Sequence, residues 1–255
     1  MKKPKVVFWD LETLPSPRQV YDRLPSIGAW PGRTLKAELQ TIMCFAYRIG
    51  EDGPNEVINV WDHSDDMHDD SALVSIAYEI LRDADEIVTH NGKQFDLKHM
   101  NTALARWGMP PLPKIDHVDT KIVAKRGLSL YSNSLDAVAQ FFGVGEKIKW
   151  NNKWSTWTRF AFGEATEADK KIMADYAKMD VEVLYQVYKR LRPFMRETVN
   201  RNHFTEGNVC PTCGSKNIHK NGVRRTKTKV YQRYLCGDCG TTSRTDMKDK
   251  YPRSL

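Results

Sequence analysis

The stretch Val6-Val7-Phe8-Trp9-Asp10-Leu11-Glu12-Thr13 joins β-branched and aromatic residues to two carboxylates. Such residues favour a strand, and alternate side chains of a strand share one face, so Asp10 and Glu12 point the same way. Two adjacent like charges are costly unless a cation lies between them, and carboxylate oxygens suit divalent cations. The stretch predicts one half of a metal site, with a solvated strand edge as the alternative for this motif taken by itself.

Charge is distributed unevenly along the 255 residues. The net charge is +7, and the segment from Asn200 onwards has 12 Lys and Arg residues against four Asp and Glu. This asymmetry indicates a partner with a phosphate backbone, although a solvated basic tail has the same composition. No apolar run approaches the roughly 20 residues that span a bilayer, and the sequence opens without a signal-peptide pattern, so we expect a cytoplasmic protein with no membrane partner.

The order of strand-like and helix-like segments predicts the fold class. An antiparallel meander of three strands is followed by alternating helices and strands, which gives an α/β sheet with one reversed strand. Asn133 and Asp136 resemble a capping box, which gives Asp136 a structural role. Residues 14–40 show no sustained period and are expected to form a long loop. The expected strands are 6–13, 41–49, 56–61, 86–89 and 118–124, and the expected helices are 73–81, 94–107, 133–142 and 167–193.

Two further carboxylates stand out. Asp96 falls in the first turn of helix 94–107, where the helix dipole favours a carboxylate whether or not it has a function. Asp180 lies within the apolar stripe of the long helix 167–193, one turn after Tyr176. A lone carboxylate on a packing face is costly unless it is paired or bound to a metal. Asp180 therefore indicates the second half of the metal site.

Three motifs together resemble a known family. They are Asp10-Leu11-Glu12, the stretch from His90-Asn91-Gly92 to Phe95-Asp96, and Tyr176-Ala-Lys-Met-Asp180. In order and spacing they are similar to the three exonuclease motifs of the DEDD superfamily of 3′–5′ exonucleases, tyrosine subclass. The resemblance covers roughly residues 5–193 and implies an RNase H-like fold, a five-stranded mixed sheet flanked by helices.

The resemblance also implies a mechanism and a set of roles. It implies a two-metal phosphodiesterase that acts at the 3′ end of a nucleic acid and releases nucleoside 5′-monophosphates. Asp10 would bridge two Mg²⁺ or Mn²⁺ ions, Glu12 and Asp180 would complete the first site, and Asp96 would hold the second largely through water. Tyr176 would orient the attacking water or hydroxide. Hard oxygen ligands suit these cations.

Several residues near the motifs have two interpretations each. His90 and Asn91 are either substrate contacts or turn residues, and Asp119 resembles a family aspartate at a strand end. Trp154 lies in a stripe of three tryptophans at helical spacing, which either faces the core or forms a basic, aromatic platform for unpaired bases. The stripe consists of Trp150, Trp154 and Trp157.

Four cysteines in the C-terminal segment predict a structural zinc site. Cys210-x-x-Cys213 and Cys236-x-x-Cys239 are two knuckles whose thiolates bind one tetrahedral Zn²⁺, and such pairs without a secretion signal favour zinc over disulfides. Four thiolate ligands leave no open coordination position, so we expect a structural ion. The segment resembles the zinc ribbons of transposase-like proteins.

Basic residues lie between the two knuckles. We interpret them as a clamp that contacts phosphates rather than bases, with a protein-interaction ribbon as the alternative. The expected nucleic-acid-binding residues are Asn91, Trp154, Lys220, Arg224, Arg225, Lys227, Lys229 and Arg233.

The sequence therefore predicts an RNase H-like exonuclease domain over residues 1–199 and a basic zinc ribbon over residues 200–255. The leading hypothesis is a metal-dependent 3′–5′ exonuclease of DNA that acts at single-stranded or unpaired 3′ ends. A 3′–5′ exoribonuclease with the same site is the first alternative. The second is a non-catalytic nucleic-acid-binding or recruitment module that acts through the ribbon, against which the presence of all four carboxylates and the tyrosine argues.

Overall fold

A computed structural model describes residues 3–15, 41–145, 153–196, 198–205 and 207–246. The larger of its two sheets has five strands in the order β3-β2-β1-β4-β5. Strand β2 runs antiparallel to β1 and β3, whereas β4 is parallel to β1 and β5. This is the mixed sheet with one reversed strand that the sequence predicts. The strands are β1 (Val6–Thr13), β2 (Ile42–Ile49), β3 (Glu56–Asn59), β4 (Glu86–Thr89) and β5 (Asp116–Asp119).

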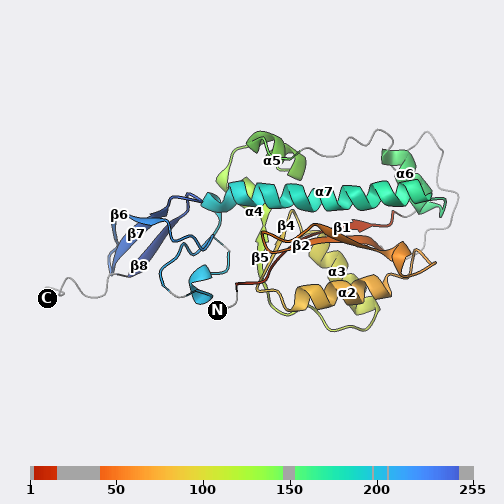
Figure 1. Cartoon of the computed structure of the whole chain (residues 1–255), viewed down its shortest axis with the longest axis horizontal. Coiled ribbons are helices and arrows are strands. Elements are labelled where there is room, and N and C mark those ends of the chain that lie inside the picture. The colour runs from red at the N-terminus through yellow and green to blue at the C-terminus, as the bar shows by residue number, and fades with distance from the viewer. Residues whose placement is uncertain (1–2, 16–40, 146–152, 197, 206, 247–255) are drawn as a thin grey trace.

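Helices cover both faces of this sheet, as expected (Figure 1). Helices α5 and α7 lie on one face, and α2 and α3 lie on the other. In the described part of the chain, no helix is both long and apolar enough to cross a bilayer. The helices are α2 (Ser71–Arg82), α3 (Asp96–Arg106), α4 (Thr120–Gly127), α5 (Leu135–Phe142), α6 (Lys153–Ala161) and α7 (Glu167–Leu191).

Strand β1 is central because its residues pack on both faces of the sheet. The Phe8 ring meets the rings of Tyr185 and Tyr188 of α7 edge-on, with centroids 5.3 and 5.0 Å apart. Side chains at intervals of two share a face of a strand, so Asp10 and Glu12 lie on the same face as Phe8. The α7 side of the sheet therefore carries both carboxylates.

Helix α7 is 25 residues long and is fixed at its start by a capping box. The Thr166 hydroxyl accepts the Asp169 N–H, and the Asp169 carboxylate accepts the Thr166 N–H. Arg159 of α6 forms an ion pair with the same carboxylate. One face of α7 is buried against β1, β2 and β3, and this face carries Tyr176 and Asp180 over the central strands.

Two expected elements end differently in the structure. The strand expected over 118–124 is wrong beyond Asp119, because the Asp119 side chain accepts the N–H groups of Lys121 and Ile122 and starts helix α4. The strand expected over 56–61 ends at Asn59 and continues as a single 3₁₀ turn.

The expected capping box at the start of α5 is also wrong. Ser134, and not Asn133, caps the helix by accepting the Ala137 N–H at 3.2 Å. Asp136 instead accepts a hydrogen bond from the Gln140 side chain one turn later. Ser134 takes the N-cap position in place of Asn133 because its short hydroxyl reaches the backbone N–H of the third helical residue.

A second sheet lies beyond the C-terminal end of α7 (Figure 1). We call it the C-terminal sheet. Its three antiparallel strands have the order β6-β7-β8. They are β6 (Ile218–Arg225), β7 (Val230–Cys236) and β8 (Thr242–Asp246).

Buried polar contacts hold the segment between the two sheets against the larger one. Glu86, at the start of β4, is fully buried and accepts hydrogen bonds from Tyr188 Oη at 3.1 Å and from the Val199 N–H at 2.7 Å. The Arg201 guanidinium lies 3.5 Å from the same carboxylate. Beyond it, Thr241 donates to the backbone carbonyl of Arg192 at the end of α7.

Candidate metal centres

Three carboxylates converge at the centre of the larger sheet. Asp10 and Glu12 of β1 and Asp180 of α7 each place an oxygen within 4.8 Å of the other two. Asp180 is 6% exposed, and the other two are half-buried. Like charges at this separation repel strongly away from bulk water, and a divalent cation removes that cost. The donor set fits a hard cation such as Mg²⁺ or Mn²⁺.

Tyr176 lies one helical turn before Asp180 and joins the same cluster. It is 7% exposed, and its hydroxyl forms a hydrogen bond with Asp180. Burial raises the pKa of Tyr176 far above its usual range, and the charges of Asp180, Glu12 and Asp10 raise it further. The hydroxyl therefore stays protonated at physiological pH and acts as a hydrogen-bonding group.

Asp96 lies next to the cluster rather than within the 4.8 Å set. It is the first residue of α3 and is 2% exposed, and its Oδ1 accepts the backbone N–H of Leu11 at 3.0 Å. Burial raises the pKa of Asp96 to about 7, and the charge of Asp119 adds to this shift. The Leu11 N–H opposes the shift by stabilising the carboxylate.

The turn between β4 and α3 explains the spacing of the second motif. Asn91 has a left-handed backbone with φ 74°, a conformation that asparagine tolerates better than most residues. A Cβ atom at Gly92 would lie 2.3 Å from Thr89 Oγ1, so only glycine fits there. Asp119 accepts the N–H groups of Asn91 and Lys93 at 2.9 and 3.1 Å. The turn is thereby fastened to the end of β5.

His90 and Asp119, which the sequence leaves open as either functional or structural residues, form hydrogen bonds within the fold. The His90 ring lies 2.9 Å from Thr120 Oγ1 and 3.0 Å from the Asn133 carbonyl oxygen. Asp119 is buried and holds backbone N–H groups on both sides. The sequence analysis missed the role of Asp119 as a helix cap, although an aspartate directly before a helix is a typical N-cap signal. Trp157 packs against the core, whereas Trp150 and the Trp154 side chain lie outside what the structure describes.

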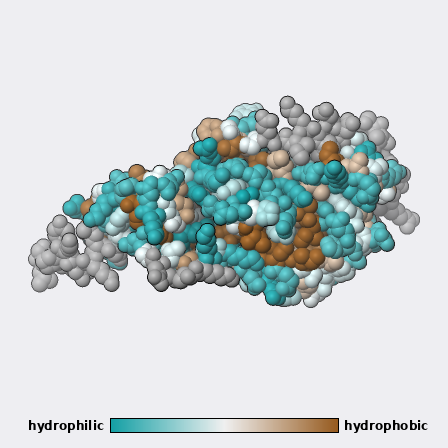
Figure 2. Space-filling view, viewed as in Figure 1, coloured by the Kyte–Doolittle hydropathy of each residue, from teal (hydrophilic) through white to brown (hydrophobic). Residues whose placement is uncertain are grey.

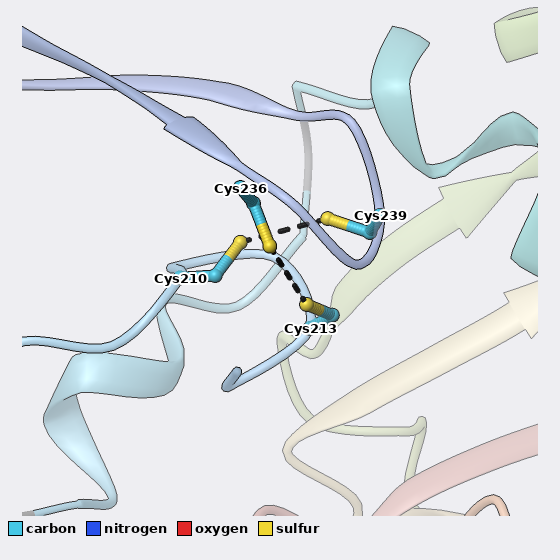
Figure 3. A group of neighbouring side chains, drawn as sticks. All are labelled: Cys210, Cys213, Cys236 and Cys239. Carbon is cyan, nitrogen blue, oxygen red and sulfur yellow. Dashed lines mark hydrogen bonds between the residues drawn. The ribbon is translucent and has the colours of Figure 1, made fainter. Parts of the chain in front are cut away.

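Four cysteines form the second cluster (Figure 3). Cys210 Sγ lies 3.6 Å from Cys239 Sγ, and Cys213 Sγ lies 3.7 Å from Cys236 Sγ. A Zn–S bond of about 2.3 Å places the sulfurs of a regular tetrahedron about 3.8 Å apart. The distances fit four thiolates around one Zn²⁺.

The two knuckles share one backbone pattern. Each cysteine pair is followed by a glycine with positive φ, Gly214 at 77° and Gly240 at 72°. Their N–H groups donate to the carbonyl oxygens of Cys210 and Cys236 at 2.8 and 3.0 Å. A hydrogen bond from the Cys213 thiol and backbone N–H groups hold the pKa of Cys210 well below its usual range. The same hydrogen bond, together with burial, raises the pKa of Cys213, and burial raises the pKa of Cys239, so a full set of four thiolates depends on a bound cation.

The basic residues expected to bind nucleic acid gather on the C-terminal sheet. All six are exposed, and hydrophilic residues cover most of this sheet on the face in view in Figure 2. Lys227 and Lys229 lie in the turn between β6 and β7, and Arg233 lies on β7. Lys220, Arg224 and Arg225 lie on β6. Arg244 of β8 is a further exposed cation that the sequence reading did not include.

The mixed five-stranded sheet, with its helices on both faces and its acidic centre, defines the class of the protein. The sequence profile of the RNase H superfamily matches residues 33–192, and the chain therefore belongs to this superfamily. The chain is also similar to the solved family B DNA polymerase from the hyperthermophilic archaeon Pyrobaculum calidifontis, with 14% identity and a TM-score of 0.48. That match covers 90% of this chain and 32% of the polymerase chain. No match to a curated protein sequence was found.

Proposed function

We propose that the protein is a metal-dependent 3′–5′ exonuclease of the DEDD type, tyrosine subclass, with DNA as its substrate. The observation that carries the proposal is the convergence of Asp10, Glu12 and Asp180 beside the Tyr176 hydroxyl. Membership of the RNase H superfamily supports the proposal. The positions of the carboxylates, on the central strand and on the helix packed over it, support it as well. The proposed domains are residues 1–199 for the nuclease and 200–255 for a zinc ribbon.

In this proposal, Asp10, Glu12 and Asp180 would hold one Mg²⁺ or Mn²⁺, and Asp10 and Asp96 would hold a second such ion. When bound, a pair of these ions stabilises the charge on the entering and leaving oxygens of an in-line phosphoryl displacement. Glu12 and Asp10 lie on one strand face, so the strand fixes their relative position. Asp96 is fixed against the same strand by its bond to Leu11.

Tyr176 orients the attacking water in this proposal. Its hydroxyl donates to Asp180 and keeps its proton, so its oxygen can accept a hydrogen bond from water. The water oxygen attacks the terminal phosphorus and releases one proton to solvent, the bond from phosphorus to the 3′ oxygen breaks, and that oxygen takes a proton from solvent. The product is a nucleoside 5′-monophosphate, and the shortened strand retains a 3′ hydroxyl.

The four cysteines hold one structural Zn²⁺ in the proposed ribbon, whose sulfur spacing fits the ion. The ribbon binds the phosphate backbone through its cations. We propose Lys220, Arg224, Arg225, Lys227, Lys229 and Arg233 as contacts, as the sequence predicts. Asn91 and Trp154 stay predicted contacts.

A gel time course tests the activity. The purified chain is incubated with 5′-labelled single-stranded DNA, or with RNA of the same sequence, in Mg²⁺ or Mn²⁺. We expect a ladder that shortens from the 3′ end, faster on DNA, and no ladder for the Asp10→Asn and Asp180→Asn variants. Faster shortening of RNA would select the exoribonuclease alternative. No shortening of either strand in either metal would overturn the exonuclease proposal.

A further inference from the structure

The C-terminal sheet has two faces with different side chains. Residues directly opposite each other on antiparallel strands share a face, so the pairing register assigns every side chain to one of the two. One face, which we call the arginine face, carries His219, Arg224, Tyr231, Arg233, Leu235, Thr242 and Arg244, and the register position of Asp246 at the end of β8 falls on it too. The other face carries Ile218, Lys220, Val223, Arg225, Val230, Gln232, Tyr234, Cys236, Ser243 and Thr245.

The arginine face places two like charges directly opposite each other. Arg233 of β7 pairs in register with Arg244 of β8, and both side chains are exposed. Like charges in this arrangement destabilise a sheet, whereas an anion bound between them reverses the sign of the interaction. The pair of guanidinium groups therefore lowers the stability of the free sheet but suits an anionic ligand.

Tyr231 organises the rest of the arginine face. The Arg244 guanidinium lies 4.4 Å from the centre of the Tyr231 ring, and Arg224 is paired with Tyr231 in register from the other side. Stacking on the ring restricts a long side chain to fewer rotamers, so less entropy is lost when it binds a ligand. Asp246 occupies the register position opposite Tyr231 at the end of β8.

We propose that the arginine face, rather than the basic residues of the C-terminal sheet as a whole, binds the phosphate backbone of a single-stranded nucleic acid. The arginine face carries the three guanidinium groups of Arg224, Arg233 and Arg244, which match phosphate oxygens bidentately. The opposite face and the turn carry one arginine, Arg225, and otherwise lysines, which bind phosphate as point charges. The proposal rests on the nucleic-acid clamp of the proposed function and specifies the surface that forms it.

The position of the sheet sets a minimum length of substrate. Leu191 lies eleven positions after Asp180 in α7, which at about 1.5 Å per residue is about 16 Å. The C-terminal sheet lies beyond that end of α7 (Figure 1). A stacked strand advances about 3.4 Å per nucleotide, so one with its 3′ end at the carboxylates needs about five nucleotides or more to reach it. Shorter substrates use the carboxylate site without the arginine face.

Two triple variants with the same charge change test the proposal. The first combines Arg224→Gln, Arg233→Gln and Arg244→Gln on the arginine face. The control combines Lys220→Gln, Arg225→Gln and Lys227→Gln on the opposite face and the turn. Both are made in the full chain with Asp10→Asn, and binding of a labelled 20-nucleotide oligothymidylate is measured by anisotropy over a series of salt concentrations without chelator.

The arginine-face variant is expected to lose affinity by at least about tenfold. The slope of log K against log salt should become less steep by about 2, because each of the three lost phosphate contacts contributes roughly 0.7. The control should lose several-fold less affinity. Equal losses in the two variants would overturn the arginine face and leave the clamp itself standing. No loss in either would overturn both.

Folding and catalysis are monitored separately. The arginine-face variant should retain its zinc, because none of its substitutions is at a cysteine. Because Arg233 and Arg244 repel each other, it should also unfold at no lower a temperature than the parent chain. With Asp10 restored, hydrolysis of the p-nitrophenyl ester of thymidine 5′-monophosphate is measured in the parent chain and in both triple variants, because this substrate is too short to reach the sheet and reports on the carboxylate site alone. Absence of that hydrolysis in the parent chain as well would count against the exonuclease and not against the arginine face.

Discussion

The carboxylate of Asp96 accepts a 3.0 Å hydrogen bond from the backbone N–H of Leu11, the residue between Asp10 and Glu12. Strand β4 pairs with β1 from Val6 as far as Phe8, and Asp96 provides an acceptor beyond that point. The start of α3 is thereby tied to the strand that carries two of the clustered carboxylates. Asp96 has a structural contact in addition to its proposed part in metal binding.

This double role predicts opposite effects of Asp96→Asn on activity and stability. The amide keeps an acceptor oxygen for Leu11 but has no charge. Burial raises the pKa of Asp96 to about 7, against a value near 4 in the unfolded chain, so protonation of this carboxyl stabilises the folded state. The contribution is complete below pH 4 and is lost as the pH rises through 7. At pH 8 without divalent cations, the variant should therefore melt at a higher temperature than the parent chain, yet be inactive in Mg²⁺.

Asp96→Ala is the matched control, because it removes the charge and the acceptor together. It should gain less stability than Asp96→Asn by about 1–3 kcal/mol, the cost of a buried N–H without its partner. Thermal unfolding at pH 5 and pH 8 measures both effects. Equal melting temperatures for the two variants would show that the bond to Leu11 contributes nothing.

The hydroxyl of Tyr176 provides the second prediction. Tyr176→Phe keeps the ring packed on the helix but removes the group that bonds Asp180. If this hydroxyl orients the attacking water, kcat should fall by about 100-fold with little change in KM. Tyr185→Phe is the control, because Tyr185 lies on the same helix and packs its ring on Phe8. A Tyr176→Phe enzyme as fast as the control would remove Tyr176 from the mechanism.

The acidic cluster could be predicted from the sequence because each of its members obeys a local period. Asp10 and Glu12 alternate along a strand, and Tyr176 and Asp180 lie one turn apart within an apolar stripe, so pairing the strand with the helix brings them together. The order of strands and their one reversal follow from similar local signals. The cysteine cluster likewise depends on two short motifs, each closed by its own glycine turn.

Contacts that depend on the register of distant segments could not be predicted in this way. The end of β5 was missed for a different, local reason: Asp119 stops the strand by capping a helix, and this cap outweighs the β-branched residues that follow it. The burial of Glu86 against Arg201 joins residues 115 positions apart. The pairing of Arg233 with Arg244 needed the register of β7 against β8, which charge counting along the chain does not supply.

The buried contact between Glu86 and Arg201 predicts a strong effect on stability. Burial raises the pKa of Glu86, and the charge of Arg201 is the largest of the effects that lower it. Arg201→Met therefore leaves a buried carboxylate without its counter-ion and should lower the free energy of unfolding by about 3–5 kcal/mol. The double variant with Glu86→Gln should recover much of this loss. Urea unfolding of the four proteins measures the coupling, and additive losses would contradict a direct interaction.

Removal of zinc provides the last prediction. The C-terminal sheet buries few apolar side chains, and its two knuckles are closed through the four cysteines, so its folding should depend on the ion. The parent chain should contain one Zn²⁺, and Cys239→Ser should abolish it. Trypsin should then cut rapidly between residues 216 and 233 while the five-stranded sheet, which has its own core, resists. Cys44→Ala is the control: Cys44 is buried in β2 outside the cluster, so this variant should keep its zinc and its resistance to trypsin. A Cys239→Ser chain that keeps one zinc ion would contradict the four-cysteine site. One that loses the ion and stays resistant between residues 216 and 233 would show that the C-terminal sheet folds without it.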